Sequence, residues 1–225
     1  MKSLVTLTAI ALAATCVSAS AATLEYKPYV GFDLGYMKLH SQRGNINIPR
    51  PPLSIKLHSL FKDHQYTGTF VAGARLGEHF GVEAFVQRGK EEKQTIDLAK
   101  YGLDTSDIPV GIKPQTTTQL NFAWGLDVNG YLPVAEKLEL TAGLGVGFYN
   151  FTHGVTGSLV GTPLNLRIQQ EEDNVLGVRM SLGAEYKLNE NWSAKTNFRY
   201  VRLDPGALEW TDNIKEFTVG LRYAF

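Results

Sequence analysis

The chain has 225 residues, with 22 lysine or arginine residues against 22 aspartate or glutamate residues, and 44% of its residues are hydrophobic. A net charge near zero argues against a nucleic-acid-binding surface, which needs an excess of positive charge. The length suffices for one domain, and no stretch after residue 22 approaches the roughly 20 apolar residues that a membrane-spanning helix requires.

The first segment, residues 1–22, has the pattern of a secretory signal peptide. Lys2 is followed by an apolar run over residues 4–14 and then by small residues. This run is too short to span a bilayer as a helix, and the small residues are typical of a cleavage site after Ala21 or Ala22. We therefore expect an exported chain.

The single cysteine of the chain, Cys16, lies within this first segment. The mature part therefore has no disulfide, and its stability must come from hydrogen bonding and packing. We expect residues 23–225 to form one domain.

Alternation of apolar side chains with other side chains, which is the period of a β-strand, recurs eight times after the signal peptide. The eight segments are residues 29–37, 67–76, 82–87, 119–129, 138–149, 176–186, 192–201 and 217–225. Residues 119–129 alternate without a break, which predicts Leu120, Phe122 and Trp124 on one face. In a closed transmembrane barrel the apolar face points outward to lipid and the polar face inward.

The connections between these segments alternate in length. Long connections cover residues 39–65, 89–116 and 151–173, short ones cover residues 77–81, 133–137 and 188–191, and residues 203–213 are intermediate. Barrels of the outer membrane have this rhythm, with short periplasmic turns and longer outer loops. Leu164, Leu166 and Ile168 suggest that the third long loop continues its hairpin, and residues 96–101 have a short helical pattern.

Aromatic side chains fall near both ends of the predicted strands, as in the two aromatic girdles of a membrane barrel. They are Phe80, Tyr186, Trp192 and Phe225 at the periplasmic ends and Tyr36, Phe148 and Tyr200 at the outer ends. The alternative is a soluble sandwich or lipocalin-like barrel, in which the apolar faces would point inward.

Several stretches resemble the small outer-membrane β-barrel family of OmpA-like and opacity-type proteins. They are residues 28–36, 80–85, 183–186, 191–193, 198–200 and 220–225. The resemblance covers essentially the whole mature chain and implies an all-β, eight-stranded antiparallel transmembrane barrel in the outer membrane of a Gram-negative bacterium. In that family the terminal aromatic strand resembles the signal read by the barrel-assembly machinery, which implies this role for Phe217, Val219, Leu221, Tyr223 and Phe225.

Strand parity also predicts a charge network in the barrel lumen. It comprises the acids Asp33, Glu83, Asp127, Glu139, Glu185 and Glu216 and the bases Arg75, Arg179, Lys187, Lys195, Arg199 and Arg222. Side chains can fill an eight-stranded barrel, so we expect these charges to compensate each other. The alternative is a narrow, gated path for ions or small solutes.

No catalytic, cofactor-binding or metal site is expected. His153 and Ser158, with the acids of residues 171–173, are candidate acid–base groups, but their local sequence does not resemble that of outer-membrane enzymes that modify lipid A. The alternating glycines that begin at Gly143 lie within a strand and open no helix, so they do not form a phosphate-binding loop. No cluster has the spacing of metal ligands.

The first long loop is basic, through Arg43, Arg50, Lys56 and Lys62. These side chains could contact lipopolysaccharide phosphates or a host ligand, although a solvated loop is the simpler interpretation. The expected partners are therefore outer-membrane lipid, lipopolysaccharide, the barrel-assembly machinery and a surface ligand. The expected function is that of an integral surface protein with a structural role and loop-mediated adhesion, and a porin-like channel is the alternative.

Overall fold

The computed structural model describes residues 26–40, 45–49, 52–56, 63–95, 112–159, 165–204 and 211–225. The regular structure in these ranges consists of strands: β1 (Tyr26–His40), β2 (Asn45–Pro49), β3 (Pro52–Lys56), β4 (His64–Leu76), β5 (Phe80–Gly89), β6 (Glu92–Thr95), β7 (Ile112–Ala135), β8 (Leu138–Leu159), β9 (Asn165–Lys187), β10 (Trp192–Leu203) and β11 (Asn213–Ala224). No helix in the described ranges is long and apolar enough to cross a membrane.

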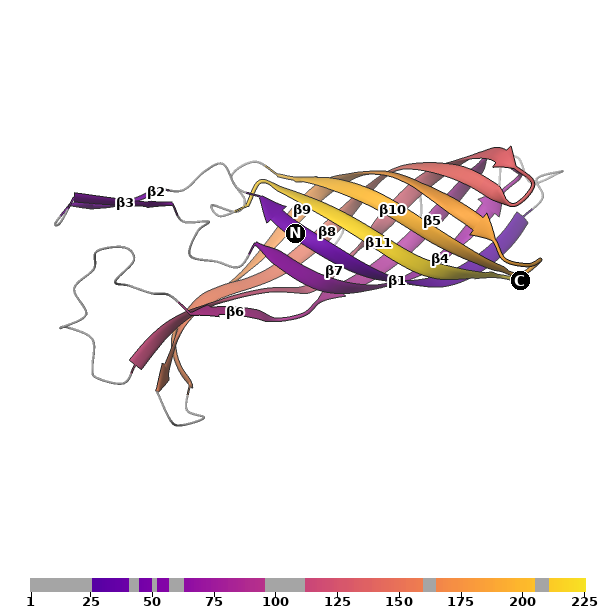
Figure 1. The fold of residues 1–225 in the computed structure, drawn as a ribbon. Helices are drawn as coiled ribbons and strands as arrows, with labels where there is room; N and C mark the ends of the chain where they lie inside the picture. Colours follow the sequence, from indigo (N-terminus) through magenta and orange to yellow (C-terminus); the bar gives the residue numbers. More distant parts are fainter. Residues whose placement is uncertain are drawn as a thin grey trace, which may run out of the picture.

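Eight of these strands form a closed antiparallel barrel (Figure 1). The order of hydrogen-bonded neighbours is β5-β4-β1-β11-β10-β9-β8-β7, and a pairing of β5 with β7 closes the ring. β1 and β11 pair continuously from Tyr29 opposite Ala224 to His40 opposite Asn213. β6 pairs with β7 beyond the end of β5, and β2 and β3 form a separate hairpin. The prediction of an eight-stranded barrel is confirmed.

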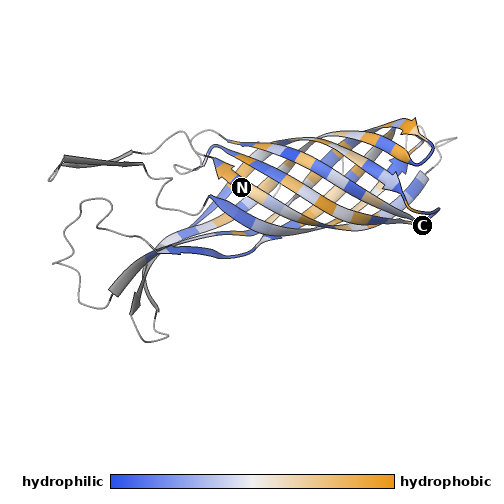
Figure 2. Cartoon of the chain, viewed as in Figure 1, coloured by the Kyte–Doolittle hydropathy of each residue, from blue (hydrophilic) through white to orange (hydrophobic). Residues whose placement is uncertain are grey.

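Hydrophobic and hydrophilic residues alternate along the barrel strands (Figure 2), and most of the large apolar side chains are exposed on the outer surface. Leu34, Leu144 and Leu182 are each more than 60% exposed, whereas Asp33 and Arg179 are each 1% exposed. A soluble barrel would have the opposite arrangement, so the soluble alternative is excluded. The outer surface is suited to lipid, as expected of a transmembrane barrel.

The short connections lie at one end of the barrel, which we term the inner end. Tyr26 pairs with Leu76 and Tyr29 with Ala224, so the described ends of the chain lie at this end as well. The turn after β4 contains Gly77, whose positive φ of 69° suits a residue without a Cβ. We term the opposite end, where the long connections lie, the outer end.

The strands extend further toward the outer end than the sequence predicted. β8 continues to Leu159 and β9 begins at Asn165, so most of the predicted third loop, residues 151–173, is a hairpin. This agrees with the alternation noted at Leu166 and Ile168. Beyond the membrane, two strands with polar side chains can still pair through their backbones. Residues 96–101, with their helical pattern, lie outside the described residues.

A bulge in β7 overturns one sequence-based placement. The register of β7 against β8 shifts between Leu120 and Phe122. Leu120 is therefore fully buried in the lumen, whereas Phe122 is 46% exposed on the outer surface. Asn121 is one extra residue on β7, so the residues of β7 before it face the side of the sheet opposite to the one that alternation predicts. Periodicity could not reveal this, because apolar side chains occur on both sides of the bulge.

Candidate functional site: the barrel interior

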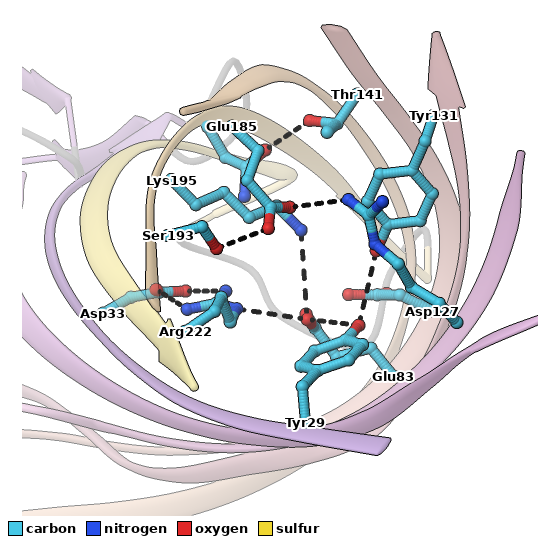
Figure 3. Close-up of polar contacts among 12 residues, drawn as sticks. Tyr29, Asp33, Glu83, Asp127, Tyr131, Thr141, Glu185, Ser193, Lys195 and Arg222 are labelled. Atoms are coloured by element: carbon cyan, nitrogen blue, oxygen red, sulfur yellow. Dashed lines mark hydrogen bonds and ion pairs between the residues drawn. The ribbon is translucent and has the colours of Figure 1, made fainter. Parts of the chain in front are cut away.

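All eight barrel strands contribute charged side chains to the lumen. The structure places the predicted network of Asp33, Arg75, Glu83, Asp127, Glu139, Arg179, Glu185, Lys195, Arg199, Glu216 and Arg222 there. Figure 3 shows side chains from opposite walls converging on the axis of the barrel. A charge buried in this way is costly unless it is paired, so the pairing decides whether the interior is stable.

The centre of the network is built around two carboxylates. Arg222 forms a bidentate pair with Asp33, with nitrogen–oxygen distances of 2.5 and 3.0 Å (Figure 3). Glu83 accepts a hydrogen bond of 3.1 Å from the Tyr29 hydroxyl. The Lys195 ammonium lies 3.9 Å from Glu83, and Arg222 Nε lies 3.6 Å from it. Strands that are distant in the sequence are thereby joined across the lumen.

Farther toward the outer end, Glu216 is held by three partners. Arg199 forms an ion pair with it at 2.7 Å, and the Thr67 hydroxyl donates a hydrogen bond of 2.6 Å. The Gln87 amide donates a further hydrogen bond to the same carboxylate. Both ionic partners are 2% exposed, so this pair is sequestered from water.

A third group of charges lies at the inner mouth of the barrel. Arg75 pairs with Glu139 and lies 3.4 Å from Glu185, and Lys187 pairs with Glu139 at 2.6 Å. The Ser193 hydroxyl donates a hydrogen bond of 2.6 Å to Glu185. A cavity of about 230 Å³ opens here. The Lys187 side chain is 46% exposed, so the network reaches the solvent at this mouth.

Arg179 has a less polar environment than the other lumen cations. It pairs with Asp127 at 3.1 Å, and its guanidinium lies 3.4 Å from the centre of the Phe85 ring. Phe85 was not among the residues predicted to face the lumen. Its position between Glu83 and Gln87, both of which point inward, gives it the inward parity and could have identified it.

Toward the outer end, the lumen also holds a cluster of buried apolar residues that we term the apolar seal. It borders the charges at Phe85, and the buried amide of Gln65, which accepts a hydrogen bond from the Leu120 N–H, lies beside it. On β1, Met37 and Leu39 follow Asp33 in the outward direction, and on β10 Val201 and Leu203 follow Arg199. All eight barrel strands contribute to the seal, which comprises Met37, Leu39, Val71, Phe85, Leu120, Ala123, Tyr149, Phe151, Val175, Val201, Leu203 and Ile214.

The seal is closely packed. The rings of Tyr149 and Phe151 stack with centroids 6.3 Å apart. A methyl group added at Gly177 would lie 2.8 Å from a methyl carbon of Val201 and 3.0 Å from the Tyr149 ring, so glycine is required for these side chains to fit. Sequence reasoning missed the seal because it considered only the charged residues at inward positions.

Most of the residues of the first loop that were predicted to contact a ligand are not described by the structure. Arg43, Arg50 and Lys62 lie outside the described residues. Lys56 ends β3, where its backbone is opposite Asn45. The role of these four residues stays a prediction.

Of the candidate acid–base groups, the side chains of His153 and Asp173 are described and lie close together. His153 lies 3.3 Å from Asp173, and Ser158 belongs to the outer part of β8. Among the described residues, no three histidine, cysteine, aspartate or glutamate side chains are grouped as metal ligands would be.

The predicted assembly residues occupy the last strand. Phe217, Val219, Leu221 and Phe225 are about half exposed or more on the outer surface, where β11 lies between β1 and β10. The backbone N–H of Phe225 donates a hydrogen bond of 3.0 Å to Pro28, which ties the end of the chain to β1.

Comparison with known proteins gives one family and several similar structures. The family described as "Outer membrane protein beta-barrel domain" matches residues 7–225. A major outer membrane protein from Thermus thermophilus is 17% identical, with a TM-score of 0.54, over 89% of this chain and 99% of that one. Neisserial surface protein A is 13% identical, with a TM-score of 0.52, over 88% and 97%. No curated protein sequence matches significantly.

Proposed function

Because the chain belongs to the outer membrane protein beta-barrel family and lies in the outer membrane of a Gram-negative bacterium, we propose that it is a non-conducting surface protein. In this proposal the barrel is an anchor with a structural role in the envelope, and the outer hairpins are the part that meets ligands outside the cell. The alternative role, a narrow channel for ions or small solutes, is disfavoured by the interior.

The observation that carries this proposal is the apolar seal. An ion that crossed it would have to leave its hydration shell between side chains such as Leu39, Phe151 and Leu203, which offer no polar replacement. Apolar constrictions of this kind stop conduction by excluding water. The charge network on the inner side of the seal is largely engaged in pairs, which also supports a structural role.

The outer extension supports a role at the surface. β7, β8 and β9 continue beyond the apolar band as a polar sheet, with β6 at its edge (Figures 1 and 2). Its exposed side chains include Lys93 and Thr95 on β6. We propose that this sheet and the basic first loop meet ligands outside the cell. Ligand binding that survived removal of the loop would contradict the role of Arg43, Arg50, Lys56 and Lys62.

Biogenesis requires further partners. We propose that the outward-facing residues of β11 are read by the barrel-assembly machinery, and that lipid and lipopolysaccharide surround the assembled barrel. The exposed apolar side chains of the last strand support the first of these roles.

Single-channel recording tests the proposed function. The barrel is refolded, its closure is checked by a heat-dependent gel shift, and it is inserted into a planar bilayer. We expect insertion without discrete current steps. Reproducible steps from the unaltered barrel would contradict the proposal and favour the channel.

A matched variant shows whether the recording could detect an opened lumen. Substitution of three seal residues, Leu39→Ser, Phe151→Ser and Leu203→Ser, should hydrate the seal and produce current. Phe198→Ser, which alters an aromatic residue on the lipid side of the barrel, should remain silent.

A further inference from the structure

Three cations lie on three neighbouring strands of the outer surface of the barrel, near its outer end, where Arg202 is diagonal to Lys215 and Tyr200 is the direct partner of Lys215. They are Lys38 on β1, Lys215 on β11 and Arg202 on β10, and all three are exposed. We term this group the cationic wall. Lys38 and Lys215 are direct partners in the register of β1 and β11. Like charges opposite each other on neighbouring strands are destabilising, so this pair needs an explanation.

The order of side chains along the strands gives the depth of the cationic wall in the membrane. On β1 the outward-facing residues are Leu34, Tyr36 and then Lys38. On β11 the same direction runs through Val219 and Phe217 to Lys215.

β10 repeats this order with Phe198, Tyr200 and Arg202. An apolar band followed by aromatic residues marks the boundary of the hydrocarbon region. The three cations lie one step beyond that boundary, which is the depth of the lipid headgroups in the outer leaflet.

The cationic wall is only partly neutralised by the protein. Lys38 lies 3.4 Å from Asp63, which also contacts His64 at 3.0 Å. Among the described residues, no carboxylate forms an ion pair with Lys215 or Arg202. Glu216, the neighbour of Lys215 in sequence, points inward to Arg199. Within the described part of the chain, neither of these two exposed cations therefore has a direct ion pair, and Asp204, which is exposed two residues beyond Arg202, is the acid that follows it in the sequence.

The opposite side of the barrel is different at its outer end. There, Asn121 donates a hydrogen bond of 2.6 Å to Asn150, which donates one of 2.9 Å to Asn174. This row of amides across β7, β8 and β9 is neutral and satisfies its own hydrogen bonds. The cross-strand cation pair therefore belongs to one wall and is not a general property of the rim.

We propose that the cationic wall binds phosphate groups of lipopolysaccharide in the outer leaflet. A phosphate placed between Lys38 and Lys215 would turn their repulsion into two attractions, and Arg202 can donate two parallel hydrogen bonds to phosphate oxygens. Lipopolysaccharide carries several phosphates on one rigid headgroup, which suits three cations on neighbouring strands. The inference rests on the orientation of the barrel in the outer membrane but not on whether its lumen conducts.

The test measures binding of purified lipopolysaccharide to the refolded barrel in detergent. The double variant K215Q/R202Q is compared with the unaltered barrel. Each cation near an anionic membrane surface raises the binding affinity about fivefold. We expect the double variant to bind at least about tenfold more weakly, and salt to reduce the difference. Enzymatically dephosphorylated lipopolysaccharide should bind both proteins equally.

The control double variant is R88Q/K90Q. Both residues are exposed near the outer end of β5 and carry the same charge, so this variant loses equal charge away from the wall. Binding that falls equally in the two double variants would overturn the site in favour of general attraction. A competition experiment uses vesicles of phosphatidylglycerol. If this phospholipid displaced lipopolysaccharide from the barrel as well as free lipopolysaccharide does, the assignment of the site to lipopolysaccharide would be wrong.

A stability measurement shows whether weaker binding by a variant comes from loss of the site or from misfolding. Its outcome does not depend on the proposed function. Without lipopolysaccharide, K215Q removes the repulsion from Lys38, so its melting temperature should equal or exceed that of the unaltered barrel. With saturating lipopolysaccharide the order should reverse. An order that stays the same in both conditions would contradict the proposal, whatever the conductance of the lumen.

Discussion

At the scale of single residues, Arg179 and Asp127 form one of the buried ion pairs of the lumen, 3.1 Å apart. Arg179 is 1% exposed and Asp127 6% exposed. We expect Asp127→Asn to lower the free energy of unfolding by about 3–5 kcal/mol, because it leaves a buried guanidinium without its counter-charge. Urea unfolding in detergent micelles measures this change.

Two further variants test the explanation. The double variant D127N/R179M removes both charges and should be more stable than D127N alone. The exposed pair of Lys93 and Glu91, 3.3 Å apart, is the control. Lys93→Gln should change the stability by less than about 1 kcal/mol. Equal losses in D127N and in the double variant would show that the charge is not the cause.

Asp63 makes the outer rim sensitive to acid. Partial burial alone would raise its pKa, but the hydrogen bond with His64 and the charge of Lys38 outweigh burial and hold the pKa of Asp63 below its usual value. A carboxylate with a lowered pKa stabilises the fold above the usual aspartate value of about 4 and loses this contribution as the pH falls through the lowered pKa.

We therefore expect Asp63→Asn to melt at a lower temperature than the unaltered barrel at neutral pH. The difference should disappear in acid, once Asp63 of the unaltered barrel is protonated. Melting curves recorded across this pH range measure the effect. A difference that grew as the pH fell would contradict the assigned interactions.

At the scale of elements, the last strand combines two roles that an experiment can separate. If Phe225 belongs to the assembly signal, as proposed above, its deletion should sharply reduce the amount of assembled barrel in cells. Refolding in micelles should persist, since the rest of β11 keeps its pairing with β1 and β10. The heat-dependent gel shift of membrane fractions measures assembly.

Phe80→Ala is the matched control for this deletion. Phe80 is an aromatic residue at the same end of the barrel and is 64% exposed, but it belongs to β5. Its loss should leave assembly nearly unchanged. Normal assembly of the chain without Phe225 would contradict the role of the last strand.

The elements also show where alternation in a sequence is informative. It located all eight barrel strands, because each has one face against lipid and one against a polar lumen. It failed at Leu120, where a bulge reverses the faces, and it ended β8 too early. Beyond the membrane no lipid imposes an apolar face, so the alternation there is short, as at Leu166 and Ile168, and does not give the full length of the strands.

At the scale of the whole molecule, the fold could be predicted from the sequence and the nature of the lumen only in part. Parity assigns Asp33 and Arg222 to the interior, but it does not say that they form a bidentate pair. Contacts across the lumen depend on the register of strands far apart in the chain. The apolar seal could have been predicted from the sequence, because Met37, Val201 and Leu203 occupy inward positions near the outer ends of their strands.

The pairing of β1 with β11 has a consequence for how the barrel comes into being. These are the first and last strands of the ring, so the ring cannot close until β11 has been made. A chain that stops before β11 would be an open sheet with two bare edges, whose backbone groups have no partners in hydrocarbon. Synthesis of β11 is therefore a condition for closing the barrel, and a chain that lacks it would expose unpaired strand edges.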